Sequence, residues 1–136
     1  MPLTLPPAAD SPRVARRYVG DALTRLGYED LVETGVLGVD ELVTNACLHA
    51  RTPLTVCVTM GPDGAPRIEV ADASDVLPMQ RPVSQTAATG RGLRLLSAAG
   101  RWGVDPSSTG GKTVWFEPAV DMDAAAFAFS DWEGGV

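Results

Sequence analysis

The spacing of apolar residues predicts two helices within the first fifty residues of the chain. The first is expected from Ser11 to Gly27, with proline in its first turn and glycine at its end, as is common for helices. One side of this helix repeats an apolar residue every four positions, which indicates an amphipathic helix. The residues of this apolar side are Val14, Tyr18, Ala22 and Leu26.

A second helix is predicted from about Asp30 to Ala50. Its apolar side consists of Val32, Val36, Val39, Val43, Ala46 and Ala50. Glu41, Asn45 and His49 are four residues apart, so they form one polar stripe roughly opposite the valines. Two interior glycines, at positions 35 and 38, each cost about 1 kcal/mol relative to alanine, which suggests that another element packs closely against this helix.

Shorter elements follow in the second half of the chain. Residues 54–60 and 67–72 have strand patterns and are separated by a turn, "GPDGAP". A loop then leads to a short helix over 91–100, and two more strands are expected at 101–106 and 112–118. Helices and strands in runs favour an α+β fold, a two-layer sandwich with helices over one face of a mixed, mostly antiparallel sheet.

Composition narrows the classes of function that the chain can serve. Its 136 residues suit a single domain, and its net charge of −6 argues against general binding of nucleic acids or anionic membranes. An anionic small ligand stays compatible, because backbone dipoles can bind one locally. Cys47 and Cys57 have neither metal-ligand nor disulfide-framework spacing and are expected to be buried thiols. No signal-peptide pattern or membrane-length apolar run is present, so we expect a cytoplasmic protein.

Four segments, taken together, resemble a known superfamily. "ELVTNACLHA", "VADAS", "TGRGLRLL" and "GGKTVWF" occur in the order typical of the GHKL ATPase/kinase superfamily, which has the Bergerat nucleotide-binding fold. The chain is most similar to the small anti-sigma-factor serine kinases and their single-domain actinobacterial relatives. The resemblance covers about residues 10–117 of a single domain spanning 1–136, and residues 118–136 form an acidic tail. It implies that the chain binds ATP and Mg²⁺.

The first segment supplies the residues expected to act on the phosphates. Mg²⁺ prefers hard oxygen ligands and keeps several waters, and the resemblance makes Asn45 its ligand. Glu41, one turn earlier, would then be the general base near the γ-phosphate. The alternative for both residues is an exposed polar face. His49 either lines the site or is a structural hydrogen-bonding residue.

The second and fourth segments carry the residues expected to recognise the base. Asp72 ends a strand, and the resemblance makes its carboxylate the acceptor for the amino group of adenine. Thr113 matches the hydroxyl that supports this contact from a neighbouring strand. The alternatives are an Asx turn at Asp72 and ordinary strand propensity at Thr113.

The third segment contains two glycines where a loop becomes a helix. Gly90, Arg91, Gly92 and Leu93 are therefore expected to bind phosphate through backbone N–H groups at a helix start. The glycines could instead only cap the helix. Arg91 and Lys112 would add positive charge to the site, unless they are ordinary surface residues.

The resemblance also implies partners and leaves two functions open. The expected substrate is a serine of a small STAS-type anti-anti-sigma protein, a sigma factor is the second partner, and a homodimer is compatible with the pattern. The sequence departs from many members because Asp72 is not followed by the D-x-G-x-G glycines and because the lid over 78–90 is short. A non-catalytic partner-binding module, with nucleotide binding reduced or lost, is therefore the alternative to a kinase. A domain that binds no nucleotide is a third interpretation.

Overall fold

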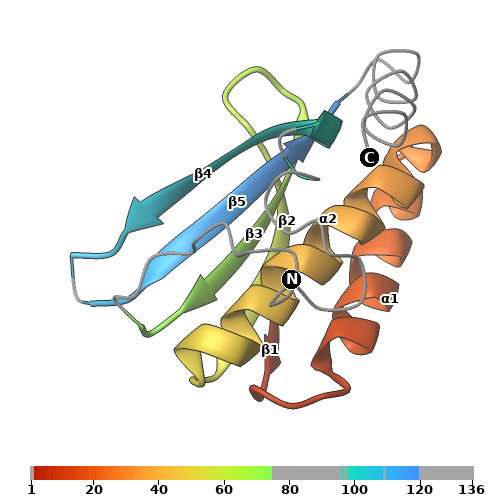
Figure 1. The fold of residues 1–136 in the computed structure, drawn as a ribbon. Coiled ribbons are helices and arrows are strands. Elements are labelled where there is room, and N and C mark those ends of the chain that lie inside the picture. The colour runs from red at the N-terminus through yellow and green to blue at the C-terminus, as the bar shows by residue number, and fades with distance from the viewer. Residues whose placement is uncertain (1, 75–95, 97, 109, 120–136) are drawn as a thin grey trace.

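In the described part of the chain, helices α1 (Ser11–Arg25) and α2 (Val32–Asn45) cover one face of an antiparallel sheet, so the fold is an α+β two-layer sandwich (Figure 1). The computed structural model describes residues 2–74, 96, 98–108 and 110–119. Its elements in chain order are β1 (Leu3–Leu5), α1 (Ser11–Arg25), a 3₁₀ turn (Glu29–Leu31), α2 (Val32–Asn45), a π turn (Ala46–Ala50), β2 (Leu54–Met60), β3 (Pro66–Asp72), β4 (Gly100–Pro106) and β5 (Lys112–Pro118).

The sheet has the strand order β1-β2-β3-β5-β4, and each neighbouring pair in it is antiparallel. The predicted α+β sandwich is confirmed, but the described sheet is antiparallel throughout instead of mixed. The four strands predicted from the sequence lie within one residue of their observed bounds. The additional edge strand β1 was not predicted, because three residues followed by two prolines give too short a pattern to recognise.

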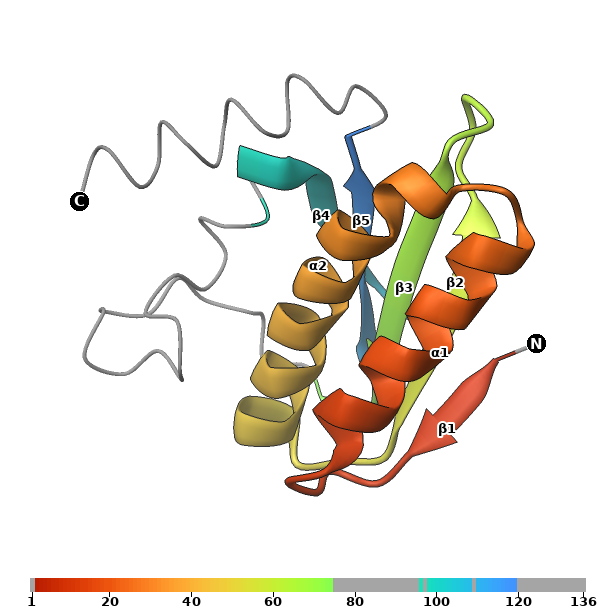
Figure 2. The same cartoon turned by 90° about the vertical axis from the view of Figure 1, so that its right-hand side faces the viewer.

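Helix α1 packs through a different side from the one predicted. Ala15, Val19 and Leu23 are fully buried, whereas Val14 and Leu26 are 37% and 52% exposed. The expected apolar side was therefore wrong by one residue along the helix, or about 100° of rotation. Apolar residues occupy both of these neighbouring sides, so their spacing alone did not decide which one meets α2 and the sheet (Figure 2).

Helix α2 lies close to the sheet because of its two glycines. A Cβ atom added at Gly38 would overlap the buried ring of Phe116 on β5, and one added at Gly35 would lie 2.6 Å from Leu23 of α1. The predicted close packing is thus confirmed at both positions. Val39 and Val43 of the predicted apolar side are fully buried as expected.

The end of α2 widens into the π turn and stops at Arg51, which has a left-handed backbone conformation with φ of 56°. Cys47 in this turn and Cys57 on β2 are free and half-buried, so burial is less complete than predicted. Burial nevertheless raises the pKa of the Cys47 thiol, although a hydrogen bond to the Ala8 carbonyl opposes the shift.

Parts of the sequence-based picture lie outside the described residues. Most of the predicted helix over 91–100 is not described. Residues 96, 98 and 99 of it are described; they are helical, and Leu96 is fully buried. The lid over 78–90 and nearly all of the acidic tail are outside the described residues as well. Among the helices that the structure describes, none has the length and apolar character needed to cross a membrane.

Candidate functional site

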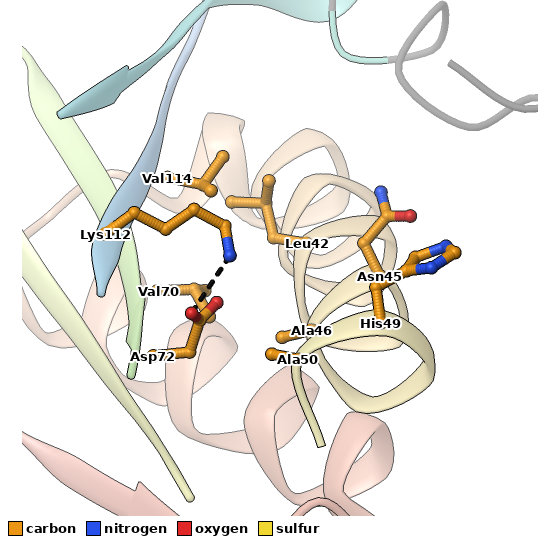
Figure 3. Close-up of a pocket in the computed structure, with 9 residues that line it drawn as sticks. All are labelled: Leu42, Asn45, Ala46, His49, Ala50, Val70, Asp72, Lys112 and Val114. Carbon is orange, nitrogen blue, oxygen red and sulfur yellow. Dashed lines mark hydrogen bonds and ion pairs between the residues drawn. The ribbon is translucent and has the colours of Figure 1, made fainter. Parts of the chain in front are cut away.

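A small cavity lies between the second half of α2 and the strands β3 and β5 (Figure 3). Its volume is about 20 Å³, which is room for about one water molecule. The cavity is lined by Leu42, Asn45, Ala46, His49 and Ala50 from α2 and the π turn, by Val70 and Asp72 from β3, and by Lys112 and Val114 from β5.

Strand register explains which side chains meet in this cavity. Asp72 lies directly opposite Lys112 in the β3–β5 ladder, and Val70 lies opposite Val114. Successive side chains of a strand point to opposite faces, so these four residues share the face that α2 covers. The valines and the helix alanines make the cavity largely apolar, and Asp72 and Lys112 place one pair of charges at its strand side.

Asp72 and Lys112 form a buried ion pair. The Lys112 ammonium donates to Asp72 Oδ1 at 2.9 Å, and the two side chains are only 6% and 2% exposed respectively. Lys112 also donates to the Ser74 carbonyl oxygen at 3.3 Å, and the Ser74 N–H donates to Asp72 Oδ1 at 2.9 Å. The Asx turn considered for Asp72 is therefore present together with the ion pair, and the interpretation of Lys112 as a surface residue is wrong.

The side-chain amide of Asn45 is buried and lacks a hydrogen-bond partner in the described part of the chain. The residue is 6% exposed, and neither Oδ1 nor Nδ2 has a partner among the described residues. Leu42, Ala46 and Ala50 point toward the strands, whereas the Asn45 amide extends from the side of α2 turned away from Asp72 (Figure 3). A buried polar group left unsatisfied costs about 1–3 kcal/mol, and such groups in folded proteins often mark a site for a ligand or ion.

Glu41 lies one turn before Asn45 and is also buried, with 5% exposure, but it does not line the cavity. The exposed polar face considered for these two residues is therefore wrong, because the helix is covered on this side as well. His49 is exposed and contributes to the cavity wall. The predicted polar stripe is thus buried in α2, at Glu41 and Asn45, and exposed in the π turn, at His49.

Thr113 is not brought into the cavity. Its neighbours Lys112 and Val114 line the cavity, so the alternation along β5 directs Thr113 to the opposite face of the sheet. The supporting contact to the base expected from Thr113 has no counterpart in this arrangement. Lys112, which the sequence suggested only as added charge, occupies the equivalent place beside Asp72. The four residues of the expected phosphate segment, Gly90, Arg91, Gly92 and Leu93, lie outside the described residues.

Asn45 Oδ1 is a hard oxygen atom without a hydrogen-bond partner among the described residues, so it could bind a hard metal ion without first losing a partner. No group of three His, Cys, Asp or Glu residues within the described ranges could hold a metal ion. No protein-family model matches the chain, and no curated protein matches it.

Proposed function

We propose that the chain binds ATP with Mg²⁺ in the cavity beneath α2 and transfers the γ-phosphate to a serine of a small partner protein. The observation that carries this proposal is the buried amide of Asn45, which has no hydrogen-bond partner among the described residues; Asn45 lines the same cavity as Asp72 and lies one turn after Glu41. The four motifs of the sequence support a GHKL-type kinase with a Bergerat fold, and the observed two-layer sandwich agrees with that assignment.

In this proposal, residues of the sheet recognise the base, and residues of α2 and the π turn bind Mg²⁺ and complete the base cavity. The apolar side chains of Ala46, Val70 and Val114 suit a flat base, and the Asp72 carboxylate would accept a hydrogen bond from its amino group. Asn45 Oδ1 would hold Mg²⁺, which supplies charge neutralisation for the phosphates when bound. His49 would lie at the rim, where polar groups of the nucleotide leave the cavity.

Phosphoryl transfer then requires few protein groups, because most of its catalysis is positioning and charge stabilisation. The serine Oγ of the partner attacks the γ-phosphorus, and the bond from that phosphorus to the β–γ bridging oxygen breaks to release ADP. Glu41 accepts the serine proton. By resemblance, the partner is a STAS-type anti-anti-sigma protein, and the kinase binds a sigma factor as its second partner.

A partner-binding module with reduced nucleotide binding is the second candidate. Two observations favour it. Asp72 already has a charged partner in Lys112, and the cavity has room for about one water molecule, which is too little for a base. This candidate predicts binding of a sigma factor without any dependence on ATP.

The decisive experiment measures the melting temperature with and without ATP and Mg²⁺, and then phosphate transfer to a STAS-type protein. Ligand at one hundred times its Kd stabilises the native state by about 2.7 kcal/mol, which raises the melting temperature measurably. Glu41→Gln should keep this shift and slow transfer by about 10²–10⁴-fold, the usual contribution of a positioned base. Asp40→Asn is the matched control. It also neutralises an acid of α2, next to Glu41, but this acid pairs with Arg16 of α1, so its loss should not slow phosphate transfer.

Two results would contradict the kinase assignment. If Glu41→Gln transfers phosphate as fast as the parent, Glu41 is not the base. If the parent shows no shift at millimolar ATP and Mg²⁺, the partner-binding module replaces the kinase.

A further inference from the structure

We infer that Lys112 gates the base cavity: its side chain fills space that a base would need and neutralises the Asp72 carboxylate that would accept a hydrogen bond from the base. The inference rests on the proposed nucleotide site and adds to it the residue that decides whether a base can enter. It is carried by the buried ion pair, the size of the cavity and the position of Lys112 in the sheet.

The position of Lys112 is fixed by the backbone. It lies directly opposite Asp72 in the β3–β5 ladder, and its side chain extends across the strand side of the cavity to the carboxylate (Figure 3). Gly111 has a φ of 85°, and a Cβ atom added to it would overlap the Asp72 carbonyl oxygen. The chain therefore enters β5 in close contact with the end of β3, so Lys112 begins beside its partner.

The ion pair competes directly with a ligand. All the hydrogen bonds of the Asp72 carboxylate within the described residues go to Oδ1, from the Lys112 ammonium and the Ser74 N–H. A base offers a neutral amino group, so its hydrogen bond to the carboxylate lacks the Coulomb attraction between opposite charges that the Lys112 ammonium adds in this buried place. A base that displaces Lys112 therefore exchanges a stronger contact of Asp72 for a weaker one.

The available space leads to the same conclusion. A volume of about 20 Å³ accommodates about one water molecule, whereas ligand pockets usually measure about 300–1,000 Å³. Lys112 itself lines the cavity, and its four-carbon stem is flexible, so withdrawal of this side chain enlarges the cavity without moving α2 or the strands. Truncation of Lys112 should therefore open the site permanently.

The test compares the affinity of the parent and of Lys112→Ala for adenosine and for ATP with Mg²⁺, by isothermal titration calorimetry. Adenosine has no phosphate, so its binding reports on the base cavity and not on attraction of phosphate by lysine. We expect Lys112→Ala to bind adenosine at least ten-fold more tightly than the parent. Lys112→Arg is the matched control, since it keeps the charge and the bulk and should bind no more tightly than the parent.

Circular dichroism establishes that each variant is folded. If Lys112→Ala does not fold, Lys112→Gln replaces it, because the neutral amide can still donate to Asp72 but holds it less strongly. Equal or weaker adenosine binding by the folded variant, with a parent that binds ATP, overturns the gate and leaves the proposed function intact. If neither the parent nor the variant binds ATP, the nucleotide site itself is wrong, and the gate is overturned with it.

Discussion

Asn45 combines a cost in stability with a proposed role in binding. Its buried amide makes no hydrogen bond to the described residues, so Asn45→Ala removes an unsatisfied polar group without breaking a hydrogen bond among them. We expect the variant to raise the free energy of unfolding by about 1 kcal/mol, near the lower end of the cost of an unsatisfied buried polar group. Urea denaturation measures this change.

The same variant should lose the stabilisation that the parent gains from ATP with Mg²⁺. Stability and ligand response would then change in opposite directions, as is common where a functional group is retained at the expense of stability. A loss of stability in Asn45→Ala of 2 kcal/mol or more, characteristic of core lesions, would instead make Asn45 a packing residue and remove the main support for the site.

Residue identities could be predicted more readily than their contacts. The spacing of Glu41 and Asn45 was enough to place them on one side of a helix, but their burial depends on elements that the helix pattern does not contain. The pair of Asp72 and Lys112 joins residues 40 positions apart in the chain. Only the register of β3 against β5 brings them together, and that register could not be derived from the local pattern of either strand.

At the scale of elements, the contact of α2 with the sheet depends on the absence of one side chain. Alanine normally stabilises a helix interior by about 1 kcal/mol relative to glycine. At Gly38, however, the added methyl would overlap the ring of Phe116, which is fully buried and cannot move into solvent. Gly38→Ala should therefore lower the free energy of unfolding by about 1–3 kcal/mol, the usual cost of overpacking.

Gly20→Ala on α1 is the matched control, because its methyl would make only ordinary contacts with Val36 and Val32 at 3.7 and 3.8 Å. It should raise the free energy of unfolding by up to about 1 kcal/mol. Relative to the parent, the melting temperatures of the two variants should therefore shift in opposite directions. Shifts of the same sign would show that α2 can move away from the sheet at little cost.

Element type was easier to predict than element orientation. The strand patterns and the glycine-rich turns gave the four longer strands almost residue by residue, because alternation and turn residues are local signals. The prediction of the buried side of α1 was wrong, because Val14 and Leu26 are as apolar as the residues that are in fact buried, Val19 and Leu23. Which of them are buried is decided by the shape of α2, which is encoded elsewhere in the chain.

At the scale of the whole molecule, three strands are held together by Glu117 on β5. Its buried carboxylate pairs with Arg67 of β3 at 2.7 Å and with Arg101 of β4 at 2.6 Å. Burial alone raises the pKa of Glu117, but hydrogen bonds from Arg101 and Arg67 outweigh it and hold the pKa below its ordinary value of 4.5. The ionised Glu117 carboxylate therefore contributes its full stabilisation at pH values above the pKa that Glu117 has in the unfolded chain.

Acid should remove this contribution, because the folded state resists protonation of Glu117. We expect the parent to melt at a higher temperature than Glu117→Gln above about pH 5, and the difference to shrink as the pH falls through the lowered pKa of the folded state. Glu69→Gln is the control for loss of one negative charge from a chain of net charge −6. A difference that stays constant down to pH 3 would exclude an ionised Glu117 as the source of the stabilisation.

The contact between Asp72 and Lys112 also determines where the chain can become longer or shorter. Folding must close the chain between these two residues, and the entropic cost of closure grows only with the logarithm of chain length, about 0.6 kcal/mol for each doubling. Insertions or deletions between β3 and β4 therefore change this cost little. Gly111 has no such freedom, because its backbone touches Asp72. Variants that change the number of residues between Ser74 and Leu96, while keeping these two residues, Gly111 and Lys112, should still assemble the cavity.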